Sequence, residues 1–284
     1  MSTPSISSVP YKNTPNRSVS VRGVTFAYRR LGPDDGVPLI LLNHLSAVLD
    51  NWDPRVVDGL ASRRPVIAFD NRGVGASGGS TPDTIEAMAR DTVLFIRALG
   101  YDRVDLLGLS MGGFIAQVIA AEEPDLVRKL ILAGTGPAGG SGIDKVTSLT
   151  IKDIVKAVLT RKDPKQYLFF TDTAGGRRAA HAFLDRLKER TNDRDKAISL
   201  SSFRAQLKAI HRWGRQAPAE SRIHQPVLVA NGESDRMVPS VNTVDLAARL
   251  PQGELEPLYP DAGHGGIFQH HDRFVPRALE FLER

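Results

Sequence analysis

The sequence predicts an α/β fold: a mostly parallel, doubly wound sheet with an inserted helical cap. Short apolar runs without alternation recur along the chain, and helix signals fall between them. Strands that are buried on both faces have this unbroken apolar character, because helices cover both sides of a parallel sheet. The alternation of strand and helix stops between residues 137 and 223, where the sequence is helical throughout. An insertion at this place would lie over the carboxyl ends of the strands.

We expect one antiparallel hairpin followed by parallel strands. Residues 19–31 alternate apolar and polar side chains around Gly23, which is typical of a hairpin at a sheet edge. The unbroken runs that follow are predicted as buried strands: Pro38–Asn43, Pro65–Asp70, Val104–Leu109, Lys129–Gly134 and Pro226–Asn231. Leu255–Tyr259 is the last candidate strand.

Helices are expected between these strands and throughout the insertion. Thr81 can cap a helix that has Pro82 at its first position and ends at Gly100. The other helices of the core are predicted at Met111–Glu123, Ser240–Leu250 and His270–Arg284. Within the insertion, helical patterns cover Ile151–Leu159, Arg177–Arg190 and Arg194–Trp213, with a turn at Asp163–Pro164.

These patterns divide the chain into three parts. Residues 1–17 are rich in Ser, Pro and Asn, and we expect a flexible N-terminal arm. Residues 18–136 and 224–284 form the α/β core, and residues 137–223 form the helical cap.

Composition excludes several classes of protein. The 284 residues include no cysteine, which rules out disulfides and thiolate chemistry and fits a reducing compartment, the cytoplasm. The 37 basic residues are scattered among 32 acidic ones without a long block, so we expect no nucleic-acid partner. No apolar run approaches the roughly 18–20 residues of a membrane helix. We expect a small-molecule substrate, no cofactor and no metal, while a homo-oligomer remains possible.

The motif Gly108-Leu-Ser110-Met-Gly112 marks a candidate nucleophile. It directly follows a predicted strand and directly precedes a predicted helix. A serine in this pattern sits on a sharp turn, which exposes its oxygen above the sheet edge, and glycine is needed because side chains would collide there. The sequence therefore predicts Ser110 as a nucleophile.

A serine hydroxyl needs a base that is held in one tautomer. His264 lies in a glycine-rich loop after the last candidate strand, and Asp235 follows the strand before it. Because the carboxyl ends of parallel strands meet at one edge, we expect Ser110, Asp235 and His264 to come together. Glu233 is the alternative acid.

The adjacent His270 and His271, beside Asp272, suggest a metal site. Neighbouring side chains at a helix start diverge, however, and the sequence offers no third ligand nearby. We therefore interpret this group as a solvated helix end.

An acyl transfer also needs donors for the oxygen anion that develops on the substrate. The Met111 amide follows the nucleophile and is one expected donor. The second is expected from the loop after Asn43, and we favour the amide of Ser46 over that of Leu45. His44 is expected to be structural, with substrate contact as a secondary role.

Together these residues resemble the α/β-hydrolase superfamily from about Val19 to Leu282. The order Ser110, Asp235, His264 matches that family, and Asp70-Asn-Arg-Gly-Val-Gly-Ala-Ser77 is similar to its structural turn after the fourth strand. The helical cap and Ser110-Met-Gly-Gly113 resemble the branch of carboxylesterases, perhydrolases, enol-lactonases and carbon–carbon bond hydrolases. Asn43-His-Leu-Ser46 differs from the usual His-Gly and is closer to the Asn-Ser-Leu-Gly of 3-oxoadipate enol-lactonases.

This resemblance implies hydrolysis of a small carboxylic ester or lactone through an acyl-enzyme. A serine nucleophile argues against epoxide hydrolases and haloalkane dehalogenases. Aromatic side chains of the insertion are candidates for the substrate pocket: Tyr167, Phe169, Phe170, Phe183 and Trp213. Alternatives on the same residues are perhydrolysis (haloperoxidase activity without a cofactor) and carbon–carbon bond hydrolysis. A cofactor-free oxygenase or a ligand-binding receptor module is a further alternative.

Overall fold

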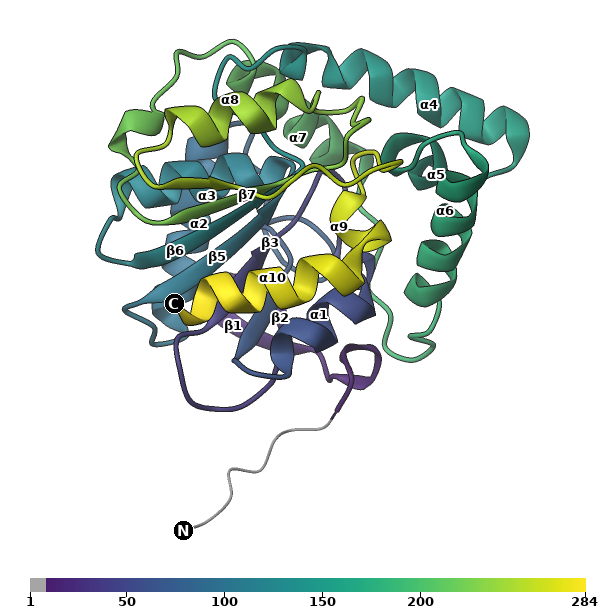
Figure 1. Cartoon of the computed structure of the whole chain (residues 1–284). Coiled ribbons are helices and arrows are strands. Elements are labelled where there is room, and N and C mark those ends of the chain that lie inside the picture. The colour runs from purple at the N-terminus through teal and green to yellow at the C-terminus, as the bar shows by residue number, and fades with distance from the viewer. Residues whose placement is uncertain (1–8) are drawn as a thin grey trace.

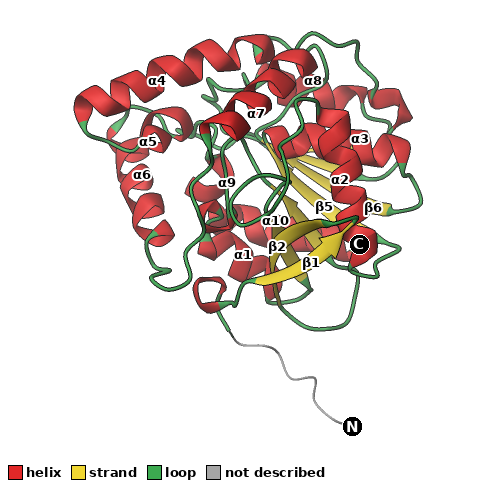
Figure 2. Ribbon diagram, turned by 180° about the vertical axis from the view of Figure 1, so that it is seen from behind, coloured by secondary structure: helices red, strands yellow, loops and turns green. Residues whose placement is uncertain are grey.

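The computed structural model describes residues 9–284 and shows one twisted sheet between two layers of helices (Figures 1 and 2). The eight strands lie in the order β1-β2-β4-β3-β5-β6-β7-β8. β1 and β2 form an antiparallel hairpin, β2 pairs antiparallel with β4, and all remaining pairs are parallel. The predicted fold class is therefore confirmed.

The strands lie close to the predicted apolar runs. Their bounds are β1 Arg17–Val21, β2 Val24–Leu31, β3 Leu39–Leu42, β4 Val66–Phe69, β5 Val104–Leu109, β6 Val127–Ala133, β7 Val227–Ala230 and β8 Gly253–Leu255. Every residue of β3, β4, β5 and β7 is buried, because both faces of the sheet are covered.

Successive residues of one strand enter two different hydrophobic cores. Ile40 and Leu42 pack on one face of the sheet, while Leu39 and Leu41 pack on the other. This follows from the period of two in a strand. The first core lies under α2 (Ile85–Ala98), α3 (Met111–Glu122) and α8 (Val241–Arg249), and the second under α1 (Pro54–Ala61), α9 (Gly266–Gln269) and α10 (His271–Glu283).

Four helices follow one another between β6 and β7 and form the helical insertion, residues 137–223. They are α4 Val146–Thr160, α5 Pro164–Phe169, α6 Ala174–Leu187 and α7 Leu200–Trp213. In Figure 1, α4, α5 and α6 extend beyond the sheet at one end of the molecule. Asp163, predicted to open a turn, instead caps α5: its side chain accepts from the Lys165 amide at 2.8 Å.

Two local predictions are wrong, and one helix was not predicted. α2 begins at Ile85 with Thr84 as its cap, so Thr81 and Pro82 precede the helix. The last strand ends at Leu255, where it was expected to begin. α1 was not predicted, although Asp53 caps it and Pro54 occupies its first turn.

The predicted N-terminal arm falls partly outside the described residues. Its described portion packs on the core. Tyr11 is buried, its hydroxyl donates to the Leu49 carbonyl at 2.6 Å, and its amide donates to Asp58 at 2.6 Å.

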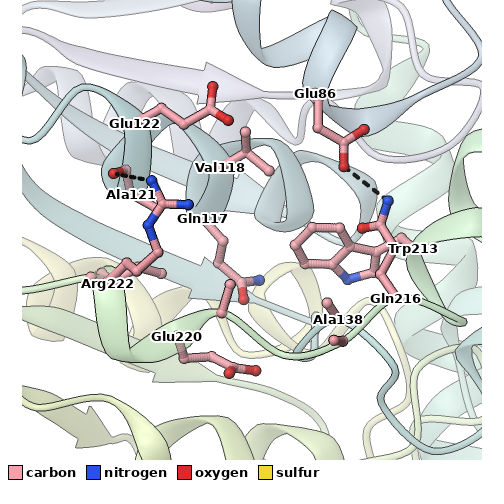
Figure 3. Close-up of a pocket in the computed structure, with 13 residues that line it drawn as sticks. Glu86, Gln117, Val118, Ala121, Glu122, Ala138, Trp213, Gln216, Glu220 and Arg222 are labelled. Carbon is pink, nitrogen blue, oxygen red and sulfur yellow. Dashed lines mark hydrogen bonds between the residues drawn. The ribbon is translucent and has the colours of Figure 1, made fainter.

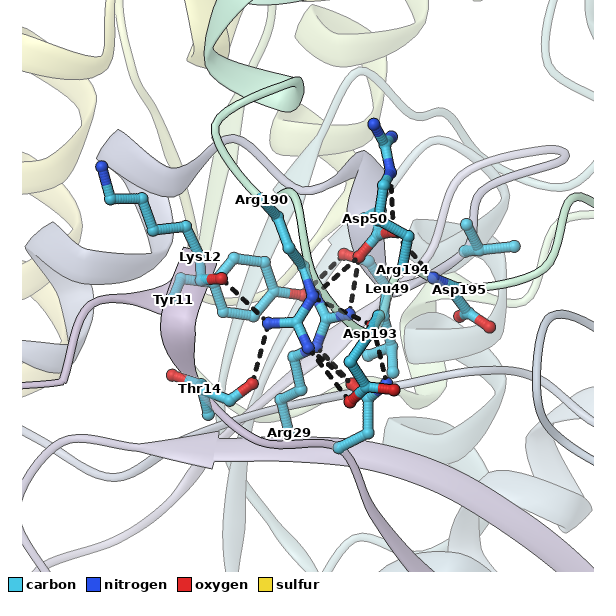
Figure 4. Close-up of polar contacts among 12 residues, drawn as sticks. Tyr11, Lys12, Thr14, Arg29, Leu49, Asp50, Arg190, Asp193, Arg194 and Asp195 are labelled. Carbon is cyan, nitrogen blue, oxygen red and sulfur yellow. Dashed lines mark hydrogen bonds and ion pairs between the residues drawn. The ribbon is translucent and has the colours of Figure 1, made fainter.

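A polar cluster around Asp50 joins this N-terminal segment and the helical insertion to the core (Figure 4). Arg29 of β2 donates to Asp50 Oδ1 at 2.6 Å, and both side chains are buried. The Asp195 amide donates to Asp50 Oδ2 at 2.8 Å, and Arg190 donates to the Thr14 carbonyl at 2.9 Å. The cluster therefore fixes the loop between α6 and α7.

Among the helices of residues 9–284, none combines the length and the apolar character that a membrane crossing requires.

Candidate active site

Ser110 occupies the sharp turn between β5 and α3. Its backbone has φ 55° and ψ −116°, a region that side chains rarely adopt. The turn is held because the Ser110 amide donates to the Ala133 carbonyl at 2.9 Å. Gly112 passes so close to the Leu42 carbonyl that a Cβ there would overlap it. The glycines of the motif are therefore required by close backbone approach.

His264 and Asp235 form a buried hydrogen-bonded pair. His264 Nδ1 lies 2.7 Å from Asp235 Oδ2, and the two side chains are at most 1% exposed. Asp235 Oδ1 accepts from the amides of Met237 and Val238 at 2.8 and 3.1 Å. These bonds fix the carboxylate, so Nδ1 of His264 carries its proton toward Asp235 and Nε2 is left to act as a base.

The alternative residues do not join this pair. Glu233 is exposed, although it lies only two residues from Asp235. The His270 ring stacks on Tyr259 at 5.3 Å, and its Nε2 lies 3.0 Å from the Pro260 carbonyl. Within residues 9–284, no three side chains of His, Cys, Asp or Glu gather as a metal site.

Ser110 and His264 line one small cavity of about 70 Å³. Predicted residues His44, Leu45 and Ser46 also line it. The remaining wall comes mainly from the helical insertion: Thr150, Ile154, Pro164, Lys165, Leu168, Phe169, Phe203 and, from the core, Met237. The insertion therefore supplies much of the cavity wall over the carboxyl edge of the sheet.

Two backbone amides near Ser110 are available to a ligand. Met111 is the first residue of α3, so its amide has no acceptor within the helix. The Leu45 amide makes no hydrogen bond to any of residues 9–284, whereas the Ser46 amide donates to Gln206 Oε1 of α7 at 2.8 Å. This arrangement favours Leu45 over Ser46 as the second donor, which reverses the preference drawn from sequence.

His44 is a neutral residue in the cavity wall. Complete burial lowers the pKa of its imidazole to about 3, and the nearby Lys165 and His264 act in the same direction, against the opposing hydrogen bond to the Leu45 carbonyl. Its ring meets Phe169 edge-on at 5.0 Å, and Phe169 meets His264 at 5.4 Å. Phe169 therefore packs against both imidazoles.

Three residues expected to contact substrate lie elsewhere. The Tyr167 hydroxyl pairs with Thr160 at 2.9 Å, and Phe170 packs on Phe183 at 5.6 Å in the core. Trp213 stacks on Phe114 at 5.3 Å and lines a separate cavity of about 130 Å³ behind α3 (Figure 3). Of the aromatic candidates in the insertion, Phe169 is the one that reaches Ser110's cavity.

Several wall residues were not predicted from the sequence. Thr150 and Ile154 lie one turn apart on α4, Phe203 lies on α7, and Met237 follows Asp235 in the same loop. The i, i+4 spacing of Thr150 and Ile154 was a usable signal once α4 was placed. No local signal identifies Phe203, because its position depends on how α7 crosses the core.

Comparisons with known proteins agree with this architecture. The family model described as alpha/beta hydrolase fold matches residues 37–271. A structure named as an alpha/beta hydrolase fold protein from Chitinophaga pinensis is 39% identical, with a TM-score of 0.91, over 96% of this chain and 99% of that one.

Two curated relatives carry more specific names. The non-heme chloroperoxidase of Streptomyces lividans is 26% identical over 92% of this chain and 97% of its own length. The poly(3-hydroxyalkanoate) depolymerase of Ectopseudomonas oleovorans is 27% identical over 90% of this chain and 87% of its own length.

Proposed function

This chain belongs to the α/β-hydrolase family, and we propose that it hydrolyses small carboxylic esters or lactones through an acyl-enzyme on Ser110. One observation carries the proposal. Ser110, on a strained turn, lines the same cavity as His264, and Asp235 Oδ2 lies 2.7 Å from Nδ1 of that histidine. This arrangement supports the roles of nucleophile for Ser110, base for His264 and orienting acid for Asp235.

In the proposed first step, Ser110 Oγ attacks the substrate carbonyl and its proton passes to His264 Nε2. Asp235 keeps the proton on Nδ1 and stabilises the imidazolium that forms. The tetrahedral intermediate collapses when His264 gives the proton to the leaving alcohol oxygen. An ester then releases its alcohol, whereas a lactone keeps it attached to the acyl group.

In the second step, water attacks the acyl-enzyme. His264 accepts a proton from the water and returns it to Ser110 Oγ as the carboxylic acid leaves. The amides of Met111 and Leu45 are the proposed donors to the oxygen anion in both steps, since neither donates to an acceptor among residues 9–284. The small apolar cavity favours short acyl groups.

The experiment is release of p-nitrophenol from acetate, butyrate and octanoate esters by wild type and Ser110→Ala. We expect a preference for the short esters and a fall in kcat of roughly 10⁴–10⁶-fold in the variant. Thermal unfolding of both proteins shows that the variant is folded. Equal rates in the two proteins would overturn the proposal and would point to the oxygenase chemistry that a His–Asp pair can support alone.

Peroxide as the second nucleophile is a competing outcome, because one relative is named as a chloroperoxidase. A peroxide-dependent bromination assay in acetate buffer, run on the same two proteins, measures it. Ester hydrolysis that exceeds bromination at equal enzyme concentration supports water as the natural acceptor.

A further inference from the structure

We propose that His44 selects substrates with a hydrogen-bond donor next to the reacting carbonyl, and that short hydroxyacyl esters are the favoured class. This inference rests on the proposed function, because it concerns which ester Ser110 attacks. It assigns to His44 a specificity role, separate from the proton transfers of His264.

The neighbouring backbone determines which ring nitrogen of His44 donates a hydrogen bond and which one accepts. Its Nδ1 lies 2.8 Å from the Leu45 carbonyl oxygen, which can only accept. Nδ1 therefore carries the ring proton, and Nε2 presents a lone pair. With a pKa of about 3, the ring stays neutral at any ordinary working pH, so Nε2 remains an acceptor.

This acceptor is buried and unused within the protein. Nε2 of His44 has no hydrogen-bond partner among residues 9–284, while His44 is 5% exposed. A buried polar atom without a partner is unfavourable, so a ligand that donates to it gains affinity. An ester with only alkyl groups cannot donate, but a hydroxyl on the acyl chain can.

The side chain of His44 lies in the wall of the cavity that Ser110 also lines. His44 directly precedes Leu45, whose free amide is the proposed oxygen-anion donor, and it lines the cavity with Ser110. The cavity of about 70 Å³ is smaller than the roughly 150 Å³ that accommodates benzene, so it favours a substrate whose hydroxyl and carbonyl lie close together. A hydroxyl one or two carbons from the carbonyl meets this requirement.

Thr150 is the second buried polar group of the wall without a partner in the described chain. Its hydroxyl both donates and accepts, so it imposes no polarity on a ligand. The surrounding wall is largely apolar: Leu45, Ile154, Pro164, Leu168, Phe169, Phe203 and Met237. Lys165 also lies in the wall, and its ammonium, 3.6 Å from Asp163, can only donate. Of the two unpartnered groups, His44 is the one that only accepts and therefore favours a donor on the substrate.

The test compares methyl glycolate with methyl propanoate, which differ by hydroxyl against methyl at the same carbon. Acid release in a pH-stat gives kcat/KM for each ester with wild type, His44→Phe and His44→Gln. We expect the glycolate-to-propanoate ratio to fall at least about 10-fold in His44→Phe, which lacks the acceptor. His44→Gln, whose amide oxygen accepts, should recover part of the ratio.

Comparing ratios removes the intrinsic reactivity of the two esters, because that reactivity is the same for every variant. The exposed His181 of α6 supplies the control: His181→Leu should keep the wild-type ratio. If His44→Phe does not fold, the test uses wild type alone. The glycolate-to-propanoate ratio of its kcat/KM values is divided by the same ratio of the hydroxide-catalysed rates. A quotient of at least about 10 supports the selection, and a quotient near one overturns it.

The inference and the proposed function fail in different ways. If Ser110→Ala hydrolyses p-nitrophenyl acetate as fast as wild type, the proposed function fails. If hydrolysis depends on Ser110 but the glycolate-to-propanoate ratio is the same in wild type and His44→Phe, only the role of His44 is wrong. A ratio that stays constant from pH 6 to 9 in wild type further supports a neutral acceptor.

Discussion

Two buried polar regions of this molecule differ in how their hydrogen bonds are used. In the cluster around Asp50, both carboxylate oxygens accept hydrogen bonds: Oδ1 from Arg29 at 2.6 Å and Oδ2 from the Asp195 amide at 2.8 Å. Nη1 of Arg29 is the atom of that ion pair that has no partner in the described chain. In the cavity of Ser110, Nε2 of His44 and Oγ1 of Thr150 have no partner among residues 9–284.

We interpret the Asp50 cluster as stabilising the fold and the polar atoms of the cavity wall as binding a ligand. Asp50 lies among three guanidinium groups, those of Arg29, Arg190 and Arg194, and joins segments more than a hundred residues apart. A buried charge with this many partners stabilises one arrangement of the chain. Unpartnered polar atoms of residues that line a cavity instead favour a ligand that forms hydrogen bonds with them. The following substitutions test this distinction, from the largest expected effect to the smallest.

Asp50→Ala should destabilise the fold by about 3–5 kcal/mol, because it leaves buried Arg29 without its carboxylate. Urea unfolding at pH 7 measures the loss. Asp34→Ala is the matched control, since Asp34 pairs with Arg30 but its side chain is 87% exposed. Its effect should stay below about 1 kcal/mol. Similar unfolding midpoints for the two variants would contradict the structural role of Asp50.

Asp70 gives a smaller effect that depends on pH. It is buried at the end of β4, where its Oδ1 accepts from the Leu49 amide at 2.9 Å, and it faces Asp195 of the helical insertion. Burial first, and then the hydrogen bond and charge of Asp195, raise the pKa of Asp70 well above its ordinary value. The folded chain therefore holds a proton that the unfolded chain releases.

The stability that comes from this proton is present below the ordinary carboxyl pKa and is lost as pH rises through the raised pKa. The side chain introduced by Asp70→Asn cannot titrate. The free energy of unfolding of this variant minus that of wild type should therefore increase from pH 4 upward, with a slope of at most about 1.4 kcal/mol per pH unit. Urea unfolding of both proteins at several pH values measures the difference. Parallel curves would show that Asp70 is ionised in the folded state.

The sheet could be predicted from sequence because its signal is local. Runs such as Leu39–Leu42 and Val66–Phe69 are apolar without interruption, and each is buried on both faces. Helix starts were less certain, because several residues before α2 could serve as caps and the structure uses Thr84. Asp53 and Pro54 had the same signature before α1, but no helix was expected there.

The candidate site could be predicted where a residue of a catalytic type follows the carboxyl end of a predicted strand. Ser110 and His264 share one cavity, and Asp235 bonds to His264, as the three strand-end positions suggested. The pocket wall was not predictable, since Trp213 and Phe169 are both aromatic residues of the insertion and only the packing of its helices decides which one faces Ser110. Likewise, the bond between Ser46 and Gln206 spans 160 residues and leaves no local pattern.

The most direct test of the acyl-enzyme account is covalent labelling with a fluorophosphonate, followed by peptide mass spectrometry. The account predicts one added phosphonyl group, located on Ser110, and much slower labelling of Asp235→Asn, in which the orientation of His264 is lost. Labelling of a different serine, or equal labelling rates for wild type and Asp235→Asn, would contradict it.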